Sequence, residues 1–259
     1  MSAVQKTYFA SDFHLGINAR LSSLEREKQI CRWLDSIRED AEALYLVGDV
    51  FDYFFEYKRV IPKGFSRILG KLAELRDENL PIFFFTGNHD MWMFHYFEDE
   101  MGIPIYREPI EINIHGKNFW IGHGDGLGPG DYGYKMIKAI FANKTCQWLF
   151  ERFHPNFGMN LMLRSSGLSR NSQPRSIEWQ GIDKERIVVF AEQESLKKPD
   201  IDFFICGHRH LPIDFTLANG HSRYINLGEW MHSNSYAVFD GKEVTMAFFE
   251  TDPINFIYP

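Results

Sequence analysis

Five short polar clusters in this sequence carry side chains that bind metal ions. They offer carboxylates, imidazoles and one carboxamide, and none contains a cysteine: Asp12-Phe13-His14, Gly48-Asp49, Gly87-Asn88-His89-Asp90, His123-Gly124-Asp125 and Gly207-His208-Arg209-His210. Oxygen and imidazole ligands without thiolate suit Mn²⁺, Fe²⁺, Zn²⁺ or a mixed centre better than a structural zinc site. The clusters therefore predict a site for divalent cations.

The spacing within two clusters indicates paired ligands. Asp12 and His14 are two residues apart, and so are His208 and His210. On an extended segment, side chains two residues apart point to the same side. We therefore expect each pair to hold one ion or two neighbouring ions, with the adjacent glycines allowing sharp turns and close approach of an anion.

A short apolar run precedes each cluster and is predicted to be a buried strand. The five runs are Thr7–Ala10, Ala43–Val47, Ile82–Thr86, Asn118–Ile121 and Asp202–Cys206. Apolar residues at helical spacing predict helices over Ser22–Glu39 and Gly64–Glu78. This alternation is typical of parallel βαβ units, whose strands place functional residues at their carboxyl ends. One such cluster alone would more often be a turn, but five in this order favour a common site.

The second half of the chain has a different pattern. Strand-like runs occur at Arg223–Leu227, Ser235–Phe239 and Val244–Phe249, and Asp240-Gly241 predicts a hairpin between the last two. We expect a second sheet here. Before it, residues 126–180 contain helical candidates at Tyr134–Phe153 and Phe157–Leu168. The prediction is a single α/β domain over residues 1–259, an αββα sandwich of two sheets between helices, with residues 126–180 as a helical insert or lid.

The clusters, in this order, resemble the calcineurin-like metallophosphoesterase family across nearly the whole chain. The resemblance implies two divalent ions, Mn²⁺ first with Fe²⁺ or Zn²⁺ as alternatives. It assigns one ion to Asp12, His14, Asp49 and His210, and the other to Asp49, Asn88, His123 and His208. Asp49 would bridge the ions, and Asn88, His89 and Asp49 would be the catalytic residues. Two cations about 3.5–4 Å apart can jointly activate a bridging water for phosphoester hydrolysis.

Two further carboxylates lie close to these ligands in sequence. Asp90 and Asp125 follow Asn88 and His123 by two residues. They are expected either to orient imidazoles by hydrogen bonding or to be ordinary surface carboxylates.

Within the family, the sequence most resembles the lipid A pathway pyrophosphohydrolases that act on UDP-2,3-diacylglucosamine. The resembling stretches are residues 10–16, 48–52 and 123–127, together with the spaced Asp131 and Tyr134. The resemblance implies a lipid-linked nucleotide sugar as substrate, with Asp131 and Tyr134 in its binding site and the insert enclosing acyl chains. His89 departs from it, because many of those enzymes carry Arg there. A general acid helps an alkoxide leaving group, so His89 keeps simpler phosphodiesters, phosphomonoesters and nucleotides as alternatives.

The composition of the insert also favours a lipid. Aromatic residues are frequent, and Trp148, Phe150 and Phe153 are predicted to contact acyl chains. Residues 130–180 carry seven Lys and Arg against three Asp and Glu, a net charge of +4 in a chain at −7. Arg164 and Arg170 are predicted to attract phosphates. The alternative is that the apolar residues are ordinary packing core and the cations a solvated face.

The remaining features limit partners and location. A net charge of −7 argues against binding of extended nucleic acid. Three cysteines cannot all be paired, and neither a leader nor a membrane-spanning run is evident. We expect a cytoplasmic enzyme in peripheral contact with the anionic inner membrane surface. A protein that keeps the fold as a scaffold without catalysis, as in some retromer-like assemblies, is a second alternative, and the sequence does not indicate an oligomeric state.

Overall fold

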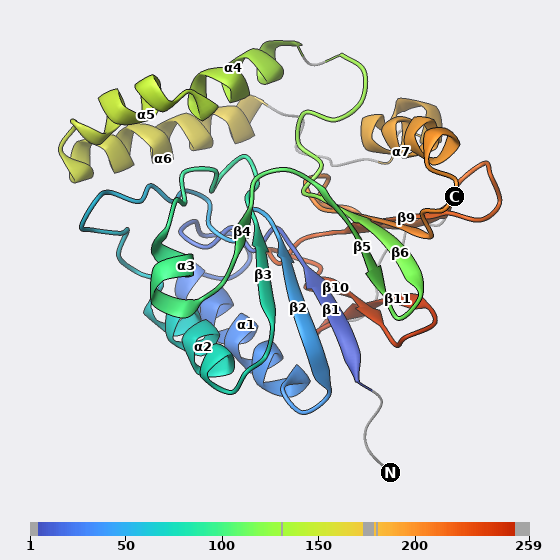
Figure 1. The fold of residues 1–259 in the computed structure, drawn as a ribbon. Coiled ribbons are helices and arrows are strands. Elements are labelled where there is room, and N and C mark those ends of the chain that lie inside the picture. The colour runs from blue at the N-terminus through green and yellow to red at the C-terminus, as the bar shows by residue number, and fades with distance from the viewer. Residues whose placement is uncertain (1–4, 131, 173–178, 180, 252–259) are drawn as a thin grey trace.

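Two β-sheets packed face to face form the centre of the computed structural model, with helices on the outer faces (Figure 1). The structure describes residues 5–130, 132–172, 179 and 181–251, and for residues 164–172 the backbone alone. The α/β class and the two-sheet sandwich predicted from the sequence are confirmed.

The first sheet has the strand order β11-β10-β1-β2-β3-β4. Its strands are β1 (Lys6–Ala10), β2 (Ala41–Val47), β3 (Ile82–Phe85), β4 (Ile105–Tyr106), β10 (Ser235–Phe239) and β11 (Val244–Phe248). The strands β1 to β4 run parallel, whereas β10 is antiparallel to both β1 and β11. The carboxyl ends of β1, β2 and β3 therefore meet at one edge of the sandwich.

The second sheet has the order β5-β6-β7-β9-β8. Its strands are β5 (Ile110–Ile114), β6 (Lys117–Ile121), β7 (Phe203–Cys206), β8 (Pro212–Thr216) and β9 (Arg223–Leu227). The central strands β6, β7 and β9 are parallel. Phe9 and Phe85 of the first sheet pack against Phe119 and Ile205 of the second, in a buried cluster between the sheets.

The predicted strands are present, but their division between sheets was partly wrong. The β10–β11 hairpin pairs with β1 in the first sheet, whereas β6 and β7 belong to the second. The Asp240-Gly241 turn determines which strands form the hairpin but not which sheet edge the hairpin joins. Packing decides that point, because Ala237 and Phe239 on β10 fill the space between the sheets.

Helices cover both outer faces. The first sheet is covered by α1 (Ser23–Ile37), α2 (Ser66–Asp77) and α3 (Tyr96–Met101). The second is covered by α7 (Arg186–Lys197), which follows the short 3-10 helix η1 (Ile182–Lys184). The α1 prediction is confirmed to within two residues, because the Ser22 side chain accepts a hydrogen bond from the Glu25 N–H and caps the helix.

The described residues between β6 and η1 form three helices: α4 (Tyr132–Ala142), α5 (Lys144–Glu151) and α6 (Pro155–Ser172). The single helix predicted over residues 134–153 is interrupted, because the Asn143 side chain accepts hydrogen bonds from Thr145 N–H and Cys146 N–H and starts a new helix. Figure 1 shows this three-helix segment beyond the carboxyl ends of β1–β3. No helix in the described part of the chain is both long and apolar enough to cross a bilayer.

Candidate metal centre

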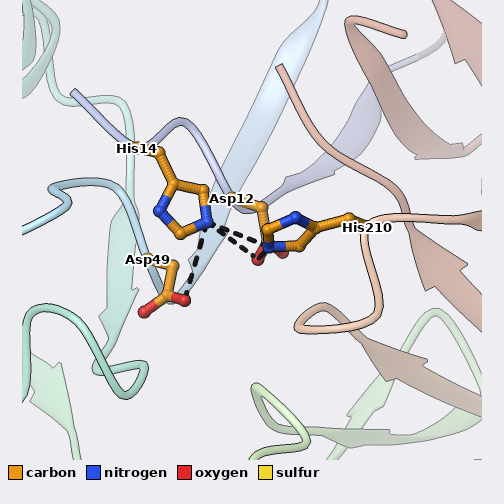
Figure 2. Close-up of side chains that lie close together, drawn as sticks. All are labelled: Asp12, His14, Asp49 and His210. Carbon is orange, nitrogen blue, oxygen red and sulfur yellow. Dashed lines mark hydrogen bonds and ion pairs between the residues drawn. The ribbon is translucent and has the colours of Figure 1, made fainter. Parts of the chain in front are cut away.

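The loops that follow the parallel strands bring the predicted ligands together. The ligand atoms of Asp12, His14, Asp49 and His210 all lie within 4.8 Å of one another (Figure 2). A second group with the same spacing consists of Asp49, His123 and His208. Asp49 belongs to both groups, which is the position that a bridging carboxylate would take.

In the first group, ring nitrogens and carboxylate oxygens lie close to one another. His210 Nε2 lies 3.1 Å from Asp12 Oδ1 and 3.0 Å from His14 Nε2. His14 Nε2 is 3.6 Å from Asp12 Oδ1 and 3.8 Å from Asp49 Oδ2. The other Asp12 oxygen accepts hydrogen bonds from the Ser11 hydroxyl and the His208 N–H. Asp12 Oδ1 is thereby directed at the two imidazoles.

Among the described residues, three buried polar atoms of the predicted ligands have no hydrogen-bond partner: Asp12 Oδ1, Asn88 Oδ1 and His123 Nε2. A buried polar atom without a partner costs about 1–3 kcal/mol, so native proteins rarely keep one without a reason. All three are potential ligand atoms for a hard or borderline cation. The residues present therefore fit the divalent metal ions that the resemblance implies.

In the second group, each oxygen of the Asp49 carboxylate has its own neighbour. His123 Nε2 lies 3.3 Å from Asp49 Oδ2, and the His89 N–H donates to Asp49 Oδ1 at 2.8 Å. Asn88 directly precedes His89, so its backbone lies next to the N–H that contacts Asp49.

The backbone at the ligands is not extended, contrary to the sequence-based expectation. Asp12, His14, Asp49, His208 and His210 all have positive φ, between 44° and 69°. For residues other than glycine this region is uncommon and costs on the order of 1–3 kcal/mol each. Such residues cluster at functional sites, where the surrounding structure over-determines the backbone.

The strained backbone is held by hydrogen bonds between neighbouring strand ends. Asp12 N–H donates to Gly48 O and His14 N–H donates to Asp49 O, both at 3.0 Å. These bonds continue the parallel pairing of β1 with β2 beyond the ends of both strands. The ligands thus meet because hydrogen bonds join the loop after β1 to the loop after β2. They do not meet because one extended strand presents them on the same side.

Two glycines allow close approach at the centre. Gly48 has φ +85°, and a Cβ atom there would lie 2.5 Å from His123 Nδ1. A Cβ atom on Gly87 would collide with the Asp49 carboxylate. Glycine is needed at these positions for contacts among the ligands themselves, in addition to any approach of an anion.

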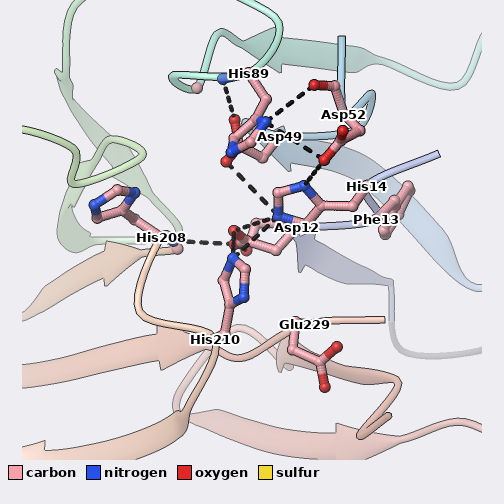
Figure 3. A network of polar contacts seen from close by, with 12 residues as sticks. Asp12, Phe13, His14, Asp49, Asp52, His89, His208, His210 and Glu229 are labelled. Carbon is pink, nitrogen blue, oxygen red and sulfur yellow. Dashed lines mark hydrogen bonds and ion pairs between the residues drawn. The ribbon is translucent and has the colours of Figure 1, made fainter. Parts of the chain in front are cut away.

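Hydrogen bonds to the second ring nitrogen orient two imidazoles. His14 Nδ1 lies 3.2 Å from Asp52 Oδ1 (Figure 3), and His123 Nδ1 lies 2.8 Å from Val47 O. A proton on each Nδ1 leaves Nε2 as the ligand atom. Asp52 also accepts from His89 Nδ1 through its backbone oxygen at 3.0 Å. Sequence reasoning gave Asp52 no role, and its position three residues after Asp49 was the available signal.

Asp90 and Asp125 have neither of the roles expected of them. Asp90 is buried and accepts N–H groups of residues 49, 50, 51 and 87, so it joins the loops after β2 and β3. Asp125 is also buried and contacts α4, through the Tyr134 hydroxyl at 2.7 Å and Lys138 Nζ at 2.6 Å. Both are structural carboxylates, and Asp52 is the side chain that orients an imidazole.

The histidines of the centre differ in pKa, so some are protonated and one is neutral in the metal-free protein. Burial alone would lower the pKa of His14, but the neighbouring carboxylates of Asp12 and Asp52 outweigh it and raise that pKa to about 10. Burial also opposes the charge on His123, yet Asp49 raises its pKa well above the usual value. Burial and the neighbouring His123 lower the pKa of His208 to about 4.

The carboxylates stay ionised at the same time. Burial would raise the pKa of Asp12 and of Asp49, but adjacent imidazoles hold both pKa values well below the usual range. His14 is the main partner of Asp12, and His123 is the main partner of Asp49. Without metal, two protons on imidazoles thus balance two buried carboxylates, and a cation would compete with those protons.

The predicted substrate-binding residues have different environments. The Tyr134 ring centroid lies 6.3 Å from that of His208, beside the centre. Phe150 is buried against Phe55 and Trp92, whereas Trp148 and Phe153 are 53% and 47% exposed. Asp131 lies outside the described residues, as do the side chains of Arg164 and Arg170.

The sequence is similar to those of known proteins. A model of the calcineurin-like phosphoesterase family matches residues 6–212. A UDP-2,3-diacylglucosamine hydrolase of Porphyromonas gingivalis is 37% identical over 261 residues, covering 95% of this chain and 98% of the relative. One of the same name from Aeromonas salmonicida is 27% identical over 238 residues, covering 90% of this chain and 89% of the relative.

Solved structures of more distant proteins are also similar. The phosphoesterase Yfce from E. coli has a TM-score of 0.45 at 14% identity, covering 95% of this chain and all of the other. Zinc-bound Vps29 from Entamoeba histolytica has a TM-score of 0.43 at 13% identity, with coverages of 93% and 90%. The family match spans all five ligand clusters up to His210, and on that match the chain belongs to the calcineurin-like phosphoesterase family.

Proposed function

We propose that this chain hydrolyses the pyrophosphate bond of UDP-2,3-diacylglucosamine, releasing UMP and 2,3-diacylglucosamine 1-phosphate. The observation that carries the proposal is the 37% identity, over nearly the full length of both chains, to a relative named for this substrate. The phosphoesterase family supplies the reaction class, and the relatives' names supply the substrate.

In this proposal two divalent ions occupy the two ligand groups. Asp12, His14, Asp49 and His210 would hold one ion, and Asp49, Asn88, His123 and His208 the other. Such ions lower the pKa of a bound water and neutralise negative charge on phosphate oxygens. We favour Mn²⁺, because carboxylate, carboxamide and imidazole ligands without thiolate suit it.

The chain's own residues would orient the reactants around this centre. Asp49 would contribute its carboxylate to both ligand groups. His89, whose Nδ1 faces the Asp52 backbone oxygen at 3.0 Å, would act on the substrate through Nε2, either as a hydrogen-bond donor to phosphate or as a proton donor to the leaving group.

The three-helix segment is the part of the molecule best suited to acyl chains. Among the described residues, twelve large hydrophobic side chains are exposed, and nine of them lie in this segment. These nine are Tyr132, Met136, Ile137, Ile140, Trp148, Leu149, Phe153, Phe157 and Leu161. An exposed apolar surface of this kind marks a binding surface for a lipid or a partner. Tyr134 and Lys138 join the segment to Asp125 beside the centre.

We further propose that this segment acts as a lid and makes peripheral contact with the anionic cytoplasmic surface of the inner membrane. The net charge of +4 over residues 130–180 and the exposed apolar residues of the segment together favour an interface with anionic headgroups. Arg164 and Arg170 would contribute to that attraction.

A second candidate is the hydrolysis of another phosphodiester, phosphomonoester or nucleotide by the same centre. His89 favours it, because an alkoxide leaving group gains from a nearby proton donor and a phosphate leaving group needs little help. The experiment is to offer UDP-2,3-diacylglucosamine, dinucleotides and aryl phosphates to Mn²⁺-loaded protein and identify the products. UMP from the lipid substrate at the highest kcat/KM supports the first proposal, and preference for aryl phosphates supports the second. A metal-loaded protein inactive on all three would favour a scaffold.

A further inference from the structure

Arg26 is a fully buried cation whose partners all lie in one loop. From α1, its Nε donates to Phe13 O at 2.9 Å, and its Nη2 donates to His14 O at 2.6 Å and Ile17 O at 2.7 Å. Its Nη1 lies 3.5 Å from Leu21 O. The loop between β1 and α1 is therefore folded around a single guanidinium.

This loop carries two of the predicted metal ligands, and its conformation is strained where they occur. Asp12 and His14 have φ of +56° and +44°. The side facing β2 is held by the hydrogen bonds from Asp12 and His14 to Gly48 and Asp49. Arg26 holds the opposite side, because the His14 carbonyl accepts from the guanidinium while the His14 N–H donates to Asp49 O. Both polar groups of the His14 backbone are thus fixed by different elements.

The guanidinium is not simply one half of an ion pair. Among the described residues, no carboxylate oxygen lies within 4.0 Å of Arg26, although Glu229 and Asp52 are close enough to oppose the lowering of its pKa by burial. A buried charge is costly unless hydrogen bonds compensate it. Here the compensation comes from backbone oxygens of the β1–α1 loop, which indicates that the planar fork of donors holds this loop in place.

We propose that Arg26 is a positioning residue that fixes the backbone of His14 and so directs its Nε2 towards the ion held by Asp12, His14, Asp49 and His210. The inference rests on the proposed metal centre. It predicts that loss of the fork weakens this ion site, and leaves the site that contains His123 and His208 much less affected. Substitution of residues that orient ligands typically costs 10–100-fold in metal affinity.

The chain offers a matched control in Arg76. This residue extends from α2 and also donates to three backbone oxygens, those of Leu80, Met101 and Gly102, at 2.8–3.3 Å. Its partners carry none of the predicted ligands. A change in metal affinity that follows from general loosening of a loop would therefore occur in both variants.

The experiment titrates metal-free Arg26→Lys, Arg76→Lys and parent protein with Mn²⁺ by calorimetry, with His210→Gln and His208→Gln identifying which binding step belongs to which site. Lysine keeps the charge but cannot reproduce the planar fork. We expect Arg26→Lys to lower the affinity of the step lost in His210→Gln by 10–100-fold. Arg76→Lys should leave both steps within about twofold, as a variant outside the network does. Equal affinities in Arg26→Lys and parent, or equal losses in the two lysine variants, would overturn the proposal.

A second measurement uses the unaltered protein, in case Arg26→Lys does not fold. Because coupling is reciprocal, a residue that favours metal binding must itself be stabilised when metal binds. We expect Mg²⁺, a diamagnetic probe, to slow hydrogen exchange at Arg26 Nε–H and to leave Arg76 Nε–H unchanged. No difference between the two arginines would contradict the role. Neither measurement contains substrate, so each is independent of whether the lipid proposal is correct.

Discussion

The Nε2 atom of His14 lies 3.0 Å from the Nε2 atom of His210, although 196 positions separate the two residues in sequence. Two imidazole nitrogens at this distance cannot both present lone pairs, so a proton or a cation must lie between or beside them. Asp12 Oδ1, 3.1 Å from His210 Nε2, adds a negative charge on the same side. Protons and divalent cations therefore compete for this pair.

That competition predicts opposite pH dependences for the metal-free and metal-loaded protein. His14 has its pKa raised to about 10, against about 6.5 in the unfolded chain. Its contribution to the stability of the metal-free protein is therefore complete below pH 6.5 and is lost as pH rises through about 10. Metal binding requires neutral imidazoles, so stabilisation by Mn²⁺ should increase over the same window. The measurement is the unfolding midpoint against pH with and without Mn²⁺.

The matching variant for this prediction is His14→Gln, which removes the titrating group. The pH slope of the metal-free midpoint should then decrease between pH 6.5 and 10. If the slopes of parent and His14→Gln coincide over that range, the assignment of the raised pKa to His14 fails.

Asp49→Ala should abolish turnover and reduce bound metal, because two cations would then repel each other without a shared anion. We expect kcat/KM to fall by more than the roughly 100-fold typical of residues that only orient ligands. Metal content by mass spectrometry and kinetics at saturating Mn²⁺ test this together. Asp40→Ala is the control, since Asp40 pairs with Lys6 away from the centre. Activity near that of the parent in metal-replete Asp49→Ala would exclude a bridging role.

The sequence predicted which residues form the centre better than how they reach it. Asp-x-His and Gly-His-x-His are recognisable because the ligands alternate with Phe13 and Arg209, whose side chains have other partners: Phe13 packs against Trp33 and Trp230, and Arg209 pairs with Glu185. The left-handed backbone at the ligands could not be predicted, because it is imposed by pairing between loops 30 or more residues apart.

Long-range hydrogen bonds explain the other differences between prediction and structure. Asp90 was recognised as a carboxylate near a ligand, yet its acceptance of N–H groups from residues 49–51 depends on a second loop. Asp52 orients His14, which is 38 residues earlier in the chain. The helix break at Asn143 is different, because the capping residue was visible in the sequence and the apolar periodicity concealed it.

His89→Ala should affect alkyl phosphate esters more than pyrophosphates if His89 donates a proton to the leaving group. General acid catalysis contributes about 10²–10⁴-fold where the leaving group needs it, so the losses in kcat should differ by at least about 100-fold. His95→Ala is a control, because His95 is on the same connection but mostly exposed. Equal losses on the two substrates would assign His89 to phosphate binding instead.

Phe150→Ala should destabilise the protein and not act on one substrate in particular. Phe150 is buried with Phe55, Tyr57 and Trp92, where α5 packs on the loops after β2 and β3. Truncation of a buried Phe typically costs about 3–5 kcal/mol. Urea unfolding should show this loss, and activity on acylated and deacylated substrates should decrease together. A loss confined to the acylated substrate would instead place Phe150 in the acyl site.

Trp148 and Phe153 should distinguish acylated from deacylated substrates, because about half of each side chain is exposed and available to a ligand. Full burial of an aromatic side chain stabilises a complex by about 1.5–3 kcal/mol, so covering the exposed half contributes on the order of 1 kcal/mol. Each alanine variant should therefore lower kcat/KM for a long-chain substrate about fivefold, since 1.4 kcal/mol corresponds to tenfold. The same variants should leave a deacylated UDP-glucosamine substrate nearly unchanged. Part of the loss should occur in kcat, because binding energy from remote groups can be expressed in the transition state.

The control for this prediction is Leu196→Ala, which truncates an even more exposed apolar residue on α7, outside the three-helix segment. It should leave both substrates unaffected. Circular dichroism must first show that each variant keeps its helices. Trp148→Ala also removes the ring beneath the Arg152 guanidinium, whose Cζ is 4.5 Å from the ring centroid, so Arg152→Gln separates loss of that cation from loss of the ring. If Trp148→Ala and Phe153→Ala lower kcat/KM equally for both substrates, these aromatics support the fold, and the assignment of the three-helix segment to acyl chains is wrong.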